Sequence, residues 1–131
     1  SCNSSNNRRI IDTTKQDNWQ TSGNVTIKDS LLTISKPNSR AVLKCSNYKD
    51  FDLKLKVLTT PNSKGTIGFH TDDSGKGYHI VINNDDNDPI WWRKTGSLLS
   101  VQNLTKSMVK DEEWFDMHIR VEGQAITISI N

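Results

Sequence analysis

Apolar and polar residues alternate with a period of two along much of this chain. The clearest run covers residues 51–57, where four apolar residues alternate with three charged ones. Residues 115–121 and 126–130 repeat the pattern on either side of the turn Glu122-Gly123-Gln124. A period of two over this length predicts strands with one buried face and one wet face.

Shorter alternating runs predict further strands, separated by turns rich in Gly, Asn, Asp and Ser. They cover residues 25–28, 31–34, 41–43, 66–70 and 78–82. The pattern at residues 90–92 and 96–100 does not distinguish between two structures: a short strand, or a loop that crosses the mouth of the sheet. Helix is confined at most to the N-terminal arm or residues 104–109.

Taken together, about nine short strands with no helical period predict an all-β fold, an antiparallel β-sandwich. Trp19 and Trp114 flank apolar runs and are expected in the core, whereas His118 is expected on a wet face. The residues predicted to be buried between two sheets are Phe51, Leu53, Leu55, Met117, Ile119, Ile126 and Ile128.

At 131 residues the chain fits one domain. We assign residues 1–17 to an N-terminal arm and residues 18–131 to the sandwich. The last predicted strand stops at Asn131, so we expect either that final strands are missing from this sequence or that the edge is covered in another way.

Charge and hydropathy narrow the classes of partner. The net charge is only +2, and no run of Lys or Arg suggests a surface that follows a phosphate backbone. We therefore expect no nucleic-acid partner. No apolar run reaches the roughly 18 residues that a membrane-spanning helix needs.

The two cysteines leave alternatives open. Cys2 follows a small residue and precedes the polar run 3–7, an arrangement that resembles the acylation junction of a bacterial lipoprotein. This interpretation predicts an exported protein of the periplasm or outer membrane, held at the membrane only through a lipid on Cys2. A Cys2–Cys45 disulfide or two free thiols would fit the same spacing.

Several short motifs, in order, resemble a family of secreted bacterial proteins, the 3-keto-disaccharide hydrolases. Their order and spacing from about residue 18 onward carry the resemblance, since no single motif is specific. The motifs are Asn18-Trp19, the hairpin 25–34, residues 48–53, Gly65-Thr66-Ile67-Gly68-Phe69, Gly77-Tyr78, residues 95–98, Glu113-Trp114 and residues 119–123.

The resemblance implies a concanavalin-like jelly roll that holds a carbohydrate on a concave sheet. It also implies cleavage of a glycosidic bond in a sugar oxidised at its third carbon, by proton abstraction and β-elimination. Such chemistry needs a general base and a group that stabilises an enolate. The chain departs from the family at His79, where members usually carry Glu, and at His70, where many carry Arg.

Strand alternation nominates the candidate site. If Ile67 and Phe69 face the core, His70 faces away from it, and the same argument applied to the next strand places His79 and Asn83 on that face. Neutral imidazole is a competent base near pH 7, and a His pair can also hold a metal. Two ordinary solvent-facing histidines would fit the pattern equally.

Residues 91–94, which follow the oxygen-rich run 83–88, supply further candidates. Of the adjacent Trp91 and Trp92, one can stack on a sugar while the other is buried. Arg93 or Lys94 can bind hydroxyls or an enolate. The predicted catalytic residues are His79, His70 and Arg93, and the predicted substrate-binding residues are Asn83, Trp91, Lys94 and Tyr78.

No metal site or cofactor is assigned, although the oxygen-rich run 83–88 leaves a divalent cation such as Ca²⁺ open beside a solvated turn. The leading function is therefore cleavage of a 3-keto-disaccharide or a related glycan. The alternatives are a non-catalytic carbohydrate-binding module and a structural adhesion domain.

Overall fold

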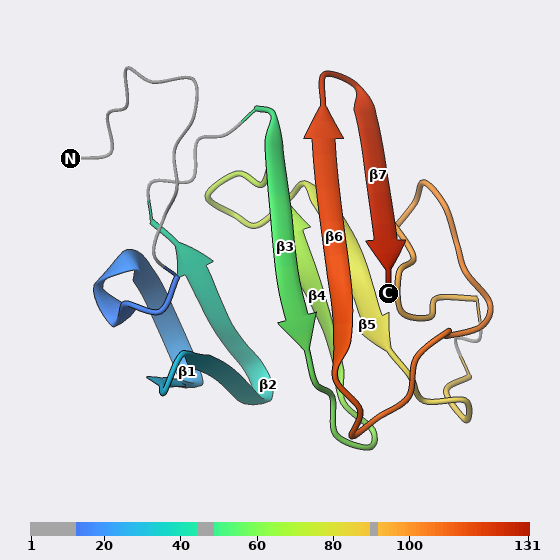
Figure 1. The fold of residues 1–131 in the computed structure, drawn as a ribbon, viewed down its shortest axis with the longest axis horizontal. Helices are drawn as coiled ribbons and strands as arrows, with labels where there is room; N and C mark the ends of the chain where they lie inside the picture. Colours follow the sequence, from blue (N-terminus) through green and yellow to red (C-terminus); the bar gives the residue numbers. More distant parts are fainter. Residues whose placement is uncertain (1–12, 45–48, 90–91) are drawn as a thin grey trace. The chain divides into compact units, whose positions relative to one another are not determined.

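The computed structural model describes residues 13–44, 49–89 and 92–131, which form two compact units, residues 1–47 and residues 48–131. All named strand pairs are antiparallel. Figure 1 shows the elements along the chain. They are a 3₁₀ helix at Gln16–Asn18 and the strands β1 (Trp19–Lys28), β2 (Leu31–Leu43), β3 (Phe51–Val57), β4 (Lys64–Phe69), β5 (Tyr78–Asn83), β6 (Phe115–Glu122) and β7 (Ala125–Ile130).

The first unit contains the hairpin of β1 and β2. Asp29 and Ser30 form its turn, and both have positive φ, as a two-residue type I′ connection requires. The sequence predicted two strands, at residues 31–34 and 41–43, with a turn between them; this was wrong, because β2 runs unbroken from Leu31 to Leu43. Residues 36–39 bulge opposite Gly23, so the missing N–H of Pro37 breaks no ladder bond.

The second unit is a sandwich of two sheets. One sheet has the strand order β3-β6-β7, and the other pairs β4 with β5. In Figure 1 the β4–β5 pair lies behind the three-stranded sheet. Side chains from both sheets form one buried cluster: Phe69, Ile80, Leu98, Phe115, Met117, Ile119 and Val121. The predicted all-β antiparallel sandwich is confirmed.

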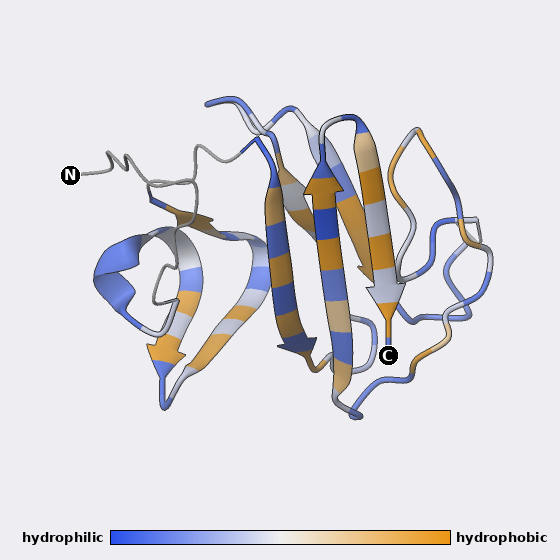
Figure 2. Cartoon of the chain, turned by 45° about the horizontal axis from the view of Figure 1, so that its top comes forward, coloured by the Kyte–Doolittle hydropathy of each residue, from blue (hydrophilic) through white to orange (hydrophobic). Residues whose placement is uncertain are grey.

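Burial follows the predicted alternation most fully on β6, the central strand of its sheet. Its four apolar residues are buried and the residues between them are not. The same alternation of apolar and polar residues appears as stripes in Figure 2. Of the predicted core residues, Met117 and Ile119 are buried, and those on the neighbouring strands β3 and β7 are partly buried against them. Trp114 is 54% exposed, so its assignment to the core was wrong, and Trp19 is half-buried.

Residues 94–99 run beside β5 and extend the smaller sheet without forming a full strand. Ile80 and Leu98 form an isolated bridge, and the Val81 amide donates to the Ser97 carbonyl (2.8 Å). This agrees with the prediction of a short strand or loop at residues 96–100. In the described ranges the 3₁₀ helix is the only helix, so residues 104–109 are not helical, and no helix there is long and apolar enough to cross a membrane.

Candidate functional site

The outer face of the β4–β5 pair carries the first candidate, His79. Gly68 pairs directly with His79, and Phe69 pairs with Tyr78. The rings of Phe69 and Tyr78 stack with centroids 5.3 Å apart. Because successive side chains alternate, Gly68 and His79 occupy the opposite face, as the sequence predicted.

Two hydrogen bonds hold the His79 ring. Its Nε2 lies 2.8 Å from the Gly75 carbonyl oxygen, and its Nδ1 lies 3.3 Å from the Thr66 hydroxyl. A carbonyl oxygen only accepts, so Nε2 carries the proton in the neutral ring and Nδ1 keeps its lone pair. The bond to Gly75 is partly buried and that to Thr66 is exposed. The basic nitrogen therefore lies on the solvent side of the half-buried ring.

Gly68 provides the space in which this ring lies. A Cβ atom at this position would be 3.0 Å from Cε1 of His79 and 3.2 Å from its Nδ1. Contacts this short are tighter than those real side chains usually make, so a side chain at position 68 would require the imidazole and the nearby Thr71 methyl group to shift by a few tenths of an ångström. Of the two glycines in Gly65-Thr66-Ile67-Gly68, the second is therefore favoured by the packing of a neighbouring side chain.

The turn that supplies the Gly75 carbonyl is organised by Asp72. One carboxylate oxygen of Asp72 accepts from the Ser74 amide (2.9 Å), the Ser74 hydroxyl (2.6 Å) and the Lys76 amide (3.0 Å). These hydrogen bonds, led by the one from the Ser74 side chain, lower the pKa of Asp72 below its usual value. Sequence reasoning placed a hairpin turn here but missed its role, although Asp-x-Ser is a common turn-forming signal.

His70 does not share the face of His79, so that part of the predicted site was wrong. Strand β4 ends at Phe69, and His70 has a φ of 51°, which breaks the alternation assumed from the sequence. Its ring lies 5.9 Å from that of Phe51 and 5.6 Å from that of Phe69. Its Nε2 is 2.8 Å from the Lys49 carbonyl oxygen. His70 therefore links the end of β4 to the start of β3, while its side chain stays exposed.

Asn83 and Lys94 make internal hydrogen bonds in the structure. Asn83 is 5% exposed, and its amide nitrogen donates to the carboxylate of Asp88 (2.9 Å). Lys94 is 2% exposed, and its ammonium donates to the Asp85 carbonyl. Burying these polar groups with partners stabilises the loop after β5. To contact a substrate as predicted, Asn83 and Lys94 would have to give up these internal hydrogen bonds for bonds to the sugar.

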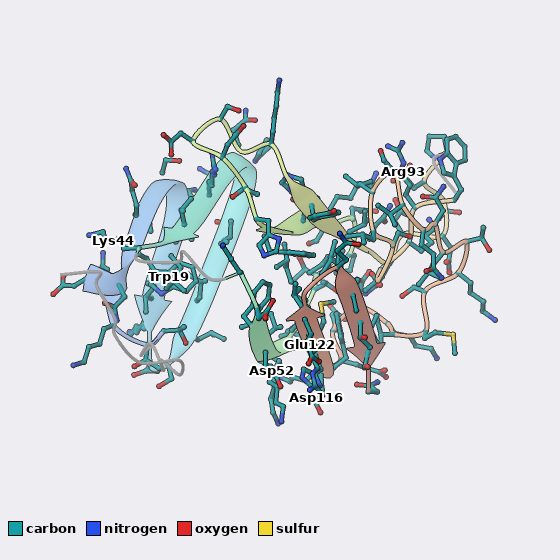
Figure 3. The ribbon with its side chains drawn as sticks, turned by 90° about the horizontal axis from the view of Figure 1, so that it is seen from above. Trp19, Lys44, Asp52, Arg93, Asp116 and Glu122 are labelled. Atoms are coloured by element: carbon teal, nitrogen blue, oxygen red, sulfur yellow. The ribbon has the colours of Figure 1, made fainter. Side chains whose placement is uncertain are left out.

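The remaining candidates lie on the surface or outside the described residues. Arg93 is exposed, and its carbonyl lies 3.5 Å from the Asn83 side-chain nitrogen, beyond the end of β5. Figure 3 shows the Arg93 side chain on this loop, away from Asp52 and Asp116 on the other sheet. Tyr78 is 39% exposed beside Phe69. Trp91 lies outside the described residues, as do Cys2 and Cys45.

Two lysines contact oxygens of the run 83–88, which the sequence left open as a cation site: Lys94 through the Asp85 carbonyl, and Lys64 through side chains. Lys64 lies 2.8 Å from a carboxylate oxygen of Asp88 and 3.9 Å from one of Asp85. The hydrogen bond to Asp88 raises the pKa of Lys64. The part of the chain that the structure describes holds no group of three or more His, Cys, Asp or Glu side chains placed to share a metal ion.

Two hollows lie elsewhere on the second unit. One, of about 550 Å³, covers the wet face of β3, β6 and β7 around Lys54, Asp116 and His118. Here His118 contacts the Asp52 carboxylate, which confirms its predicted position on a wet face. The other, of about 120 Å³, lies beside the exposed Trp114. Neither is lined by His79.

Comparison with known proteins gives one match. A family model described as a 3-keto-alpha-glucoside-1,2-lyase-like domain matches residues 7–131. No curated protein and no solved structure matches the chain. The match covers both units of the structure and includes every residue of the β4–β5 face described above.

Proposed function

The chain belongs to the 3-keto-alpha-glucoside-1,2-lyase-like family, and on that premise we propose that it cleaves the glycosidic bond of a 3-keto-glucoside. The sugar would bind on the outer face of β4 and β5, above Gly68 and beside His79. The carbohydrate partner and the reaction rest on the family, on the β-sandwich and on the chemistry of this face.

The proposed reaction is an elimination across the first and second sugar carbons. The ketone at the third carbon acidifies the hydrogen on the second, so a base of moderate strength can remove it. The electrons of that C–H bond form an enolate and then the double bond between the first two carbons, as the bond to the glycosidic oxygen breaks. The departing alkoxide takes up a proton. Water added to the double bond would complete a net hydrolysis.

The observation that carries this proposal is the pair of hydrogen-bond partners at the two ring nitrogens of His79. Its Nε2 is occupied by the Gly75 carbonyl at 2.8 Å, so the basic Nδ1 is the nitrogen turned to the exposed side. A neutral imidazole is a competent proton acceptor near neutral pH. A histidine can thus serve where members of the family usually carry a glutamate.

Arg93 is proposed as a contact to the second sugar ring. Its backbone lies beside Asn83, four residues along β5 from His79. At about 3.3 Å per residue this separation is roughly 13 Å, longer than the distance from a reacting C–H to its ketone oxygen. An exposed guanidinium at that distance suits the hydroxyl groups of the leaving sugar better than the enolate.

A carbohydrate-binding module without catalysis is the second candidate. The internal hydrogen bonds of Asn83 and Lys94 favour it, because they leave fewer groups to stabilise an enolate beside His79. In that case the same face would hold the sugar without turning it over.

Turnover of a 3-keto-disaccharide by wild type and three variants tests the proposal. His79→Ala should lower kcat by roughly 10²–10⁴-fold, the usual value of a general base. Arg93→Ala should raise KM with little change in kcat. His118→Ala, on the wet face of the other sheet, is the matched control and should behave as wild type.

Equal turnover by wild type and His79→Ala would contradict the catalytic assignment. An inert wild type that still binds the sugar, with binding weakened by Arg93→Ala, would favour the binding module. An inert wild type that binds no 3-keto-sugar would overturn the proposal as a whole.

A further inference from the structure

The surroundings of His79 form a connected set of contacts that starts at Asp72. Gly75 donates its amide to the Asp72 carbonyl (2.9 Å), and the Asp72 amide donates to the Lys76 carbonyl (2.9 Å). The Asp72 carboxylate accepts three further bonds from Ser74 and Lys76. Together these bonds fix the peptide of Gly75, whose carbonyl then accepts from His79 Nε2.

The opposite side of the ring is held from the neighbouring strand. Thr66 stands two residues from Gly68 on β4, on the same face as His79. Its hydroxyl is 3.3 Å from Nδ1 and can donate to the lone pair there. The ring is therefore fixed at both nitrogens, by a backbone carbonyl on one side and a hydroxyl on the other.

We propose that Asp72 and Thr66 are positioning residues for His79: the Asp72 turn fixes the proton on Nε2 through the Gly75 carbonyl, and Thr66 orients the basic Nδ1. Calling Nδ1 the catalytic nitrogen rests on the proposed function. The placement of the proton does not, because it follows from the hydrogen-bond partners alone.

The physical reason is that imidazole has two neutral tautomers and rotates about its side-chain bonds. A base is effective only when its lone pair is on the nitrogen that faces the proton to be removed. A carbonyl at Nε2 favours the tautomer with the lone pair on Nδ1. A hydroxyl at Nδ1 limits ring rotation and can be displaced by the substrate, since this contact is the longer and more exposed of the two.

Nitrogen-15 NMR of histidine-labelled protein at a pH where His79 is neutral tests this arrangement without any substrate. Wild type should show His79 as a single tautomer protonated at Nε2. Asp72→Ala should move its two ring signals toward the averaged values of a mobile, solvent-exposed imidazole. Asp72→Asn keeps an acceptor oxygen for Ser74 and Lys76 and should restore the wild-type signals.

Thr66 provides a second pair of variants that does not depend on the turn. Thr66→Val removes the hydroxyl with little change of shape and should alter the Nδ1 signal, whereas Thr66→Ser should preserve it. With a 3-keto-disaccharide, Thr66→Val and Asp72→Ala should lower kcat and leave KM near its wild-type value. Methyl signals of the buried Met117 and Ile119 report whether each variant keeps the fold.

A His79 protonated at Nδ1, or ring signals unchanged in folded Asp72→Ala and Thr66→Val, would overturn the positioning roles. Failure of the proposed function looks different. In that case the NMR results hold, but wild type and His79→Ala do not differ on the sugar.

Discussion

Gly65 and Gly68 lie on the same strand, but a side chain at each position would meet very different surroundings. A Cβ atom at position 65 would have nothing within 4 Å, whereas one at position 68 would press against the His79 ring at 3.0 Å. The stability of the strand and the position of the imidazole are therefore separable by single substitutions.

Gly68→Ala should lower kcat for a 3-keto-disaccharide, because the added methyl group displaces the His79 ring. Gly65→Ala is the matched control. It should leave kcat unchanged and raise the free energy of unfolding by roughly 0.4–1 kcal/mol through a less flexible unfolded chain. Equal kcat in both variants would show that the position of the ring does not limit the reaction.

The connection between β4 and β5 depends on close backbone packing at its base. A Cβ atom at Gly77 would lie 2.5 Å from the His70 carbonyl oxygen and 2.8 Å from the Thr71 Cα. Both atoms belong to the backbone, so they cannot move aside as the end of a side chain would. The left-handed φ of His70 brings its carbonyl to this place.

Gly77→Ala should therefore lower the free energy of unfolding by roughly 1–3 kcal/mol, the usual cost of overpacking. Urea denaturation measures this as a lower midpoint at an unchanged slope. A midpoint equal to that of Gly65→Ala would mean that the hairpin relaxes without cost.

The carboxylate of Asp72 should contribute less to the free energy of unfolding as the solution becomes acidic. The hydrogen bonds lower the pKa of Asp72 in the folded protein below the ordinary value of 3.8 for an aspartate, so the folded state binds a proton less readily than the unfolded chain. The contribution is present above pH 3.8 and disappears as pH falls through the lower folded value. The difference in unfolding free energy between wild type and Asp72→Ala should shrink progressively as pH falls below about 5. A constant difference would show that the carboxylate charge contributes nothing.

At the scale of the whole molecule, the buried cluster of the second unit should dominate stability. Ile119 is fully buried at the centre of the three-stranded sheet, whereas Met108 is 79% exposed. Ile119→Ala should cost roughly 2–5 kcal/mol, and Met108→Ala should stay within about 0.5 kcal/mol of wild type. Chemical denaturation of both variants checks this, and similar losses would contradict the assigned core.

Strand alternation predicted the sandwich well where a strand is flanked on both sides, as Met117 and Ile119 show. It failed at Pro37, because a bulge that absorbs a proline is decided by the partner strand and not by local sequence. It also failed at Trp114, which immediately precedes β6 and lies at the surface. An apolar residue outside the strand is not held to the strand's alternation, so the period of two does not determine which way it faces.

The candidate site was predictable in part for the same reason. His79 lies inside a regular strand, so its face followed from the period of two. His70 lies one residue past the end of β4, where a positive φ turns it the other way. The partners of Asn83 and Lys94 come from a folded loop, and no local pattern reveals such contacts.

The central claim is that His79 removes a proton from the carbon next to the ketone. The most direct measurement compares cleavage of a 3-keto-disaccharide that carries hydrogen or deuterium at the second carbon of the oxidised ring. We expect the deuterated sugar to react several-fold more slowly with wild type, and neither sugar to react appreciably with His79→Ala. Equal rates for the two sugars, together with equal cleavage of the unoxidised disaccharide, would contradict the account.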